Sequence, residues 1–128
     1  MKIEHIAFQV EDPPAMADWY CKHLGFQVKF KADEPVVNRF IADSAGDVML
    51  EIYRNPNFSI PDYSSMAPSL LHVAFGCDNV RETHQRLIDA GASPEGEIVD
   101  TGEVVITFLR DPWGFTIQLV RRTDEILP

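Results

Sequence analysis

The segment Ile3-Glu4-His5-Ile6-Ala7-Phe8 is closely similar to Leu70-Leu71-His72-Val73-Ala74-Phe75, which lies 67 residues further along the same chain. The same offset relates Met49-Leu50-Glu51-Ile52 to Thr116-Ile117-Gln118-Leu119. An offset that is kept from one pair of segments to the next indicates a duplicated module. Two copies are too few for a solenoid, so we expect two half-domains that share a core.

Each copy has the pattern of a strand, a helix and three further strands. Asp12 followed by Pro13 is typical of a helix start, and Asn79 with Glu82 has the spacing of a capping box. Strand-like periodicity covers residues 2–10, 26–30, 39–43, 48–54, 70–77, 98–100, 104–109 and 115–121. The sequence therefore predicts an α+β protein, in which two tandem βαβββ modules form a curved, partly closed mixed sheet around one cleft.

The chain length of 128 residues predicts a single domain. Within it we assign module 1 to residues 1–56, a linker to 57–69, module 2 to 70–122 and a tail to 123–128. The linker contains proline but also several large apolar residues, among them Phe58 and Tyr63. It is too apolar for a flexible tether, so we expect it to pack across the protein.

The charge balance is acidic, with 11 Lys and Arg against 20 Asp and Glu, which gives a net charge of −9. This balance disfavours nucleic acid and anionic membrane surfaces as partners. The first residues have no apolar stretch of the kind found in a signal peptide, and no apolar run reaches the ~18–20 residues that cross a bilayer. Cys21 and Cys77 form no metal or disulfide pattern. We therefore expect a cytoplasmic protein that binds a small-molecule substrate.

Four polar residues interrupt apolar strands at equivalent positions of the two copies. They are His5, Glu51, His72 and Gln118. Since the apolar rows of these strands must face the helices, the four polar side chains are expected on the opposite, concave face, and a pseudo-twofold axis would bring them into one cleft. Two imidazoles, a carboxylate and an amide oxygen suit a divalent metal ion. Zn, Ni, Co, Mn and Fe all remain open.

The same residues lie in motifs that resemble the vicinal oxygen chelate superfamily, the group of glyoxalases, bleomycin-resistance proteins and extradiol dioxygenases. The resemblance spans residues 2–122 and includes Asp18-Trp19-Tyr20, Leu50-Glu51-Ile52 and Asp111-Pro112-Trp113-Gly114-Phe115. It implies metal ligands at His5, Glu51, His72 and position 118. The common fourth ligand of the family is Glu, whereas this chain has Gln118. Glu51 is then the only carboxylate base of the expected site.

Other residues are candidates for substrate binding. The resemblance to glyoxalase I places Asn55 where an asparagine helps to hold glutathione, whereas Gln9 stands where that pattern has arginine. The further candidates for lining the cleft are Arg39, Phe40, Met49 and Tyr53. Arg122 follows Gln118 at the same strand phase, which makes it a candidate for holding an anionic group at the rim.

Three functions remain open from the sequence. The resemblance favours a metal-dependent lyase or isomerase similar to lactoylglutathione lyase, which acts on a small oxygenated or thiol-conjugated substrate through an enediolate-type intermediate, with Glu51 as the catalytic base. A metal-free, antibiotic-binding protein of bleomycin-resistance type is the first alternative. An Fe(II) extradiol-type dioxygenase is the second, because two His and one Glu also make a facial triad. The resemblance also implies a homodimer, with each site either within one chain or across two.

Overall fold

The computed structural model describes residues 1–127 and divides the chain into two compact units, Met1–Pro61 and Asp62–Pro128. The predicted tail, 123–128, ends in Pro128, which lies outside the described residues. No helix within residues 1–127 is long and apolar enough to span a membrane.

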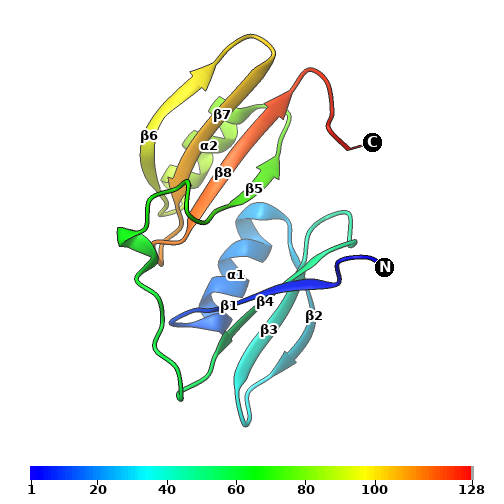
Figure 1. Ribbon diagram of the computed structural model, residues 1–128, viewed down its shortest axis with the longest axis vertical. Helices are drawn as coiled ribbons and strands as arrows, with labels where there is room; N and C mark the ends of the chain where they lie inside the picture. The colour runs from blue at the N-terminus through cyan, green and yellow to red at the C-terminus, as the bar shows by residue number, and fades with distance from the viewer. Residues whose placement is uncertain (128) are drawn as a thin grey trace. The chain divides into compact units, whose positions relative to one another are not determined.

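The first unit is a four-stranded mixed sheet with one helix on one of its faces (Figure 1). Its elements are β1 (His5–Gln9), α1 (Pro13–Leu24), β2 (Gln27–Ala32), β3 (Val37–Ala42) and β4 (Met49–Arg54). The strands lie in the order β1-β4-β3-β2. β1 is parallel to β4, and the other neighbours are antiparallel.

The second unit has the same topology, preceded by a short 3-10 helix. Its elements are η1 (Tyr63–Ser65), β5 (Val73–Gly76), α2 (Val80–Asp89), β6 (Ser93–Asp100), β7 (Val104–Arg110) and β8 (Thr116–Arg122). The strand order is β5-β8-β7-β6, with β5 parallel to β8. The predicted fold class, an α+β protein of two βαβββ modules, is therefore confirmed.

The duplication is visible in the strand register as well as in the sequence. In the first sheet Glu51 of β4 pairs with Ala7 of β1 and with Phe40 of β3. In the second sheet Gln118 of β8 pairs with Ala74 of β5 and with Phe108 of β7. Glu51 and Gln118 consequently occupy the same place in two equivalent ladders.

Both helices begin at the predicted caps. The Asp12 carboxylate accepts a hydrogen bond from the Ala15 N–H at 3.1 Å, and the Asn79 side chain accepts one from the Glu82 N–H at 3.1 Å. α1 ends at Gly25, whose φ of 73° lies in the left-handed region that favours glycine. These contacts hold each helix at the start of its βαβ crossover.

The apolar rows of the two inner strands β4 and β8 face the helices, as expected. Leu50 and Ile52 are buried in the first unit, and Ile117 and Leu119 in the second. In β1 the same row also lies on the helix side, since Ile6 pairs with Leu50, but Ile6 remains 52% exposed. β1 lies at the edge of its sheet, whereas α1 packs on β2, β3 and β4. The face of each sheet opposite its helix, called the open face below, carries Glu51 and Gln118.

Candidate metal and substrate site

The first unit brings His5 and Glu51 together on its open face. β1 and β4 are neighbouring parallel strands, and the His5 Nε2 atom lies 3.5 Å from the Glu51 Oε2 atom. The other ring nitrogen, Nδ1, is hydrogen-bonded to the Glu4 carboxylate. The ring of Phe40 meets the His5 imidazole edge to face, with the ring centres 5.3 Å apart and the planes at 81°. Strand pairing, a carboxylate and an aromatic ring thus fix the orientation of His5.

The second unit holds His72 in a similar way but with different partners. His72 lies one residue before β5, so it has no partner in the strand ladder. Its Nδ1 atom donates a hydrogen bond to the Pro68 carbonyl oxygen at 2.8 Å. Its ring meets Phe108 edge to face, with centres 5.1 Å apart and planes at 79°. Phe108 pairs in turn with Gln118, which links His72 to the open face of this sheet.

The hydrogen bonds of the two histidines determine which ring nitrogen is available. A carbonyl oxygen or an ionised carboxylate only accepts, so the Nδ1 atoms of His5 and His72 carry the proton. The Nε2 atom of His72 then keeps its lone pair, whereas the Nε2 atom of His5 faces the Glu51 carboxylate at 3.5 Å. An imidazole whose second nitrogen donates to a carboxylate or a carbonyl is the usual arrangement of a histidine that binds a metal.

The donor set of each unit is compatible with a divalent metal ion. Each unit offers one imidazole Nε2, and they offer in addition a carboxylate from Glu51 and an amide oxygen from Gln118. Within residues 1–127, no group of three or more His, Cys, Asp or Glu side chains is placed to hold a metal ion. Each unit by itself offers two of the four predicted donors, and each such pair is called a half-site below.

Several of the predicted substrate residues share the open face of the first sheet. Met49 and Tyr53 flank Glu51 at alternate positions of β4, and Phe40 is its direct partner on β3. Gln9 is also on this face, but it is buried and bonded to the chain itself. Its Oε1 atom accepts the Asn55 N–H at 2.7 Å, and its Nε2 atom donates to a backbone carbonyl at 3.4 Å. Gln9 thus holds Asn55 beside the open face.

Two predicted residues lie apart from this group. Arg39 points to the helix-covered face, opposite Phe40, because successive strand residues alternate in direction. Its guanidinium donates to the carbonyl oxygens of Ala32 and Asn38 and pairs with Asp33 at 2.9 Å. Arg122 is exposed at the end of β8, about 13 Å along the strand from Gln118 at 3.3 Å per residue.

The residues that orient the two histidines were not found from the sequence. They are Glu4, Pro68, Phe108 and, through the contacts described further below, Arg110. Two of them could have been found from the sequence. Glu4 adjoins His5, and Phe108 has the strand phase that places it on the open face. The contacts of Pro68 and Arg110 join distant parts of the chain and leave no mark in the local pattern.

The two cysteines lack the properties of a nucleophile. Burial raises the pKa of the Cys21 thiol, and the nearby Asp18 carboxylate raises it further. Burial also raises the pKa of the Cys77 thiol. A raised pKa leaves little thiolate at neutral pH, so neither thiol is poised for nucleophilic attack.

Comparison with known proteins assigns the family. Residues 2–119 match the model of the Glyoxalase/Bleomycin resistance protein/Dioxygenase superfamily, and the chain belongs to this superfamily. A lactoylglutathione lyase of Escherichia coli O157:H7 is 24% identical over 131 residues, which cover 97% of this chain and 95% of that one.

Two solved structures have the same fold over their whole length. A glyoxalase family protein from Bacillus cereus superposes with a TM-score of 0.83 at 18% identity, covering 97% of this chain and 95% of the other. An antibiotic binding protein from Streptomyces sp. CB03234 superposes with a TM-score of 0.73 at 19% identity, covering 96% of this chain and 97% of the other. Since one of these proteins binds an antibiotic, the fold alone does not decide between a catalyst and a binder, and the choice depends on individual residues.

Proposed function

We propose that the protein is a metal-dependent lyase or isomerase of glyoxalase type, which acts on a small oxygenated or thiol-conjugated substrate. Four ligands would hold a divalent metal ion, namely His5, Glu51, His72 and Gln118. The observation that carries the proposal is the matching orientation of the two imidazoles, each with Nδ1 bonded to an acceptor and with Nε2 as the nitrogen left to bind a metal. A protein that binds its ligand without metal has no need to keep two histidines in this state.

The proposed reaction moves a proton between two neighbouring carbons of a hydroxy-ketone grouping. The Glu51 carboxylate takes the proton from the carbon that carries the hydroxyl, which leaves an enediolate, and returns it to the former carbonyl carbon, while the hydroxyl proton passes to the former carbonyl oxygen. A bound divalent metal supplies Lewis acidity toward the substrate oxygens. Glu51 does this work alone, because Gln118 has no carboxylate with which to share it. An epimerisation that needs a carboxylate base at both positions is therefore not expected.

The remaining open-face residues would surround the substrate. Met49, Phe40 and Tyr53 offer apolar and aromatic surface next to Glu51. Asn55 would contribute its side-chain amide, and its backbone N–H is held by the Gln9 Oε1 atom. We propose these as the substrate-binding residues of the first unit. We also propose that the protein acts as a homodimer, in which the half-sites combine either within one chain or between two.

Metal content is the most direct test of the proposal. Protein purified without chelators should contain a stoichiometric divalent metal, and His5→Ala or His72→Ala should remove it. His84→Ala, a half-buried histidine on α2, is the matched control and should keep the metal. Turnover of a glutathione hemithioacetal then tests the lyase reaction. Cleavage of a catechol after anaerobic loading with Fe(II) would instead identify a dioxygenase.

A metal-free binding protein is the second candidate, and one observation favours it. Gln118 stands where a second carboxylate would strengthen metal binding, and no group of three or more His, Cys, Asp or Glu side chains within residues 1–127 is placed to hold a metal. Wild-type protein without stoichiometric metal, together with a His5→Ala variant that changes only stability, would establish this second function and exclude the first.

A further inference from the structure

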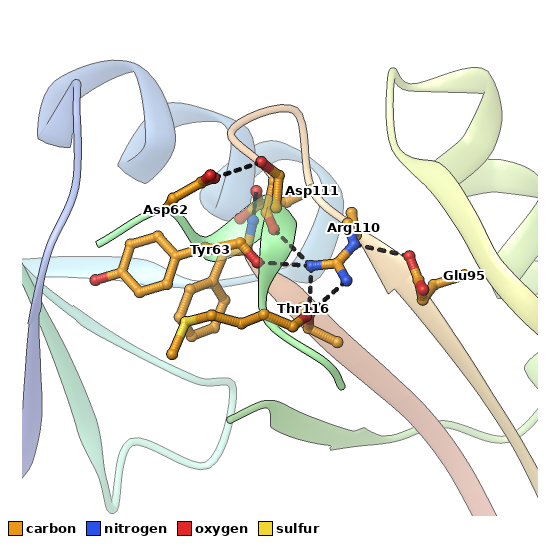
Figure 2. Close-up of polar contacts among 10 residues, drawn as sticks. Asp62, Tyr63, Glu95, Arg110, Asp111 and Thr116 are labelled. Carbon is orange, nitrogen blue, oxygen red and sulfur yellow. Dashed lines mark hydrogen bonds and ion pairs between the residues drawn. The ribbon is translucent and has the colours of Figure 1, made fainter. Parts of the chain in front are cut away.

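The guanidinium of Arg110, at the end of β7, donates hydrogen bonds through all three of its nitrogens. Its side chain is only 12% exposed, and its Nε atom donates to the Glu95 carboxylate at 2.7 Å. Nη1 donates to the Tyr63 carbonyl at 2.8 Å, the Gly114 carbonyl at 3.2 Å and the Thr116 hydroxyl at 3.0 Å. Nη2 donates to the Met66 carbonyl at 2.8 Å. Figure 2 shows the guanidinium at the centre of these partners.

Two of these contacts fasten the segment 62–68, called the strap below, to β7. Tyr63 and Met66 belong to η1 and its end, and the ring of Tyr63 packs edge to face on Phe115 with centres 5.1 Å apart. Pro68, which accepts the His72 hydrogen bond, is two residues beyond Met66. The strap therefore connects the guanidinium of Arg110 to the imidazole of His72.

β7 consequently holds His72 from two sides. Phe108 contacts the imidazole directly, and Arg110, two residues later on the same face of the strand, places the carbonyl that receives its Nδ1 proton. This support matters because His72 lies outside the strand ladder. Without the strap, no described hydrogen bond would determine which ring nitrogen of His72 carries the proton.

The first unit has no arginine at the position that corresponds to Arg110. Arg110 pairs with Thr116 on β8, and the residue at the same place of the first sheet, opposite Met49, is Ala42. His5 is instead paired within β1 and bonded to the adjacent Glu4. The arginine is thus specific to the half-site in which the histidine is not held by the ladder.

We propose that Arg110 is a positioning residue for the metal half-site of the second unit. By fixing the strap, it keeps His72 in the Nδ1-protonated tautomer with the Nε2 lone pair exposed for a ligand bond. This inference rests on the proposed metal-dependent function for its purpose, but the tautomer that it predicts belongs to the metal-free protein. The two claims can therefore be tested separately.

The decisive experiment is ¹⁵N NMR of the imidazole nitrogens in the metal-free protein, at a pH where the histidines are neutral. The His5→Gln and His72→Gln variants assign the signals. In the wild type, both histidines should show protonated Nδ1. In Arg110→Lys, which keeps the charge but loses the forked geometry, His72 should become a mixture of tautomers, while His5 stays unchanged as the internal control. Arg81→Lys, an exposed arginine paired with Asp100 in the same unit, should leave both histidines as in the wild type.

Zinc titration gives the second readout. Arg110→Lys should bind zinc about 10–100-fold more weakly than the wild type and than Arg81→Lys, which is the usual cost of losing a residue that orients a ligand. A folded Arg110→Lys protein with wild-type tautomers and wild-type zinc affinity would overturn the inference, as would an equal change at His5. If the wild type binds no zinc although the tautomer of His72 still depends on Arg110, the positioning role stands and the metal-dependent function is excluded.

Discussion

The two units of this protein build the same half-site with different means. Glu51 and Gln118 occupy equivalent ladder positions, each beside a phenylalanine whose ring packs edge to face on a histidine. In the first unit the histidine belongs to the strand and the oxygen donor is charged. In the second unit the histidine lies before the strand, the oxygen donor is a neutral amide, and the half-buried Arg110 holds the segment 62–68 that contacts the histidine.

This difference teaches that duplication preserved the geometry of the ladder and allowed the chemistry to diverge. Of the four proposed ligands, only Glu51 of the first unit is a carboxylate, so the proposed proton transfer falls to that unit. In the second unit, the contacts of Phe108 and of the segment 62–68 hold one imidazole, that of His72. Substitutions at equivalent positions should therefore have unequal effects.

The largest expected effect is at Glu51. Glu51→Gln makes the two units alike in their oxygen donors, and it should lower kcat by about 10²–10⁴-fold because the only general base is lost. The side chain is partly exposed, at 21%, so the fold should persist. Steady-state kinetics with metal-saturated protein is the measurement. The control is Glu11→Gln, which breaks only an ion pair with Arg54. A Glu51→Gln enzyme with wild-type kcat would show that the catalytic base lies elsewhere.

A second contrast concerns two equally buried arginines. Arg110 and Arg39 are each 12% exposed, but Arg110 pairs with the half-buried Glu95, whereas Arg39 pairs with Asp33, which is 70% exposed. Arg110→Ala leaves a carboxylate and several carbonyls without their donor, so the free energy of unfolding should fall by about 3–5 kcal/mol. Arg39→Ala should cost about 1–2 kcal/mol, since Asp33 remains solvated. Urea denaturation compares them, and equal losses would refute the special role of the second-unit network.

The sequence pattern predicted which residues share a face of the central strands, but not the side-chain contacts around them. The repeat, the helix caps and the phases of β4 and β8 follow from local periodicity, which is why Glu51 and Gln118 could be placed. The exposure of Ile6 depends on which strands α1 covers. Tertiary packing decides this, and local periodicity does not reveal it. The bonds from Arg110 to Tyr63 and Met66 join residues more than 40 positions apart. Alternation along β3 already separates Arg39 from Phe40, so the expectation that both line one cleft disregarded a local rule.

Gln118→Glu makes the oxygen donors of the two half-sites alike and tests whether residue 118 is a metal ligand. The change adds a negative charge at the proposed fourth ligand, and it should strengthen divalent metal binding by about one order of magnitude or more, because a full charge replaces an amide dipole. Competition with a chelator measures the affinity. Val120→Thr, two residues further on the same face of β8, is a control that adds polarity without charge. Unchanged affinity in Gln118→Glu would remove Gln118 from the ligand set.

The smallest expected difference between the units lies in their helix caps. Asp12 and Asn79 each accept one backbone N–H at 3.1 Å, and Asn79 also donates to the Glu82 carboxylate at 3.3 Å. Asp12→Ala and Asn79→Ala should each lower the free energy of unfolding by about 1 kcal/mol, with the larger loss for Asn79 because it breaks two contacts. Hydrogen exchange of the first-turn amides measures each helix separately. Protection that falls in α1 after Asn79→Ala, or in α2 after Asp12→Ala, would mean that the helices are not stabilised independently, and the description of two units with separate local structure would have to be abandoned.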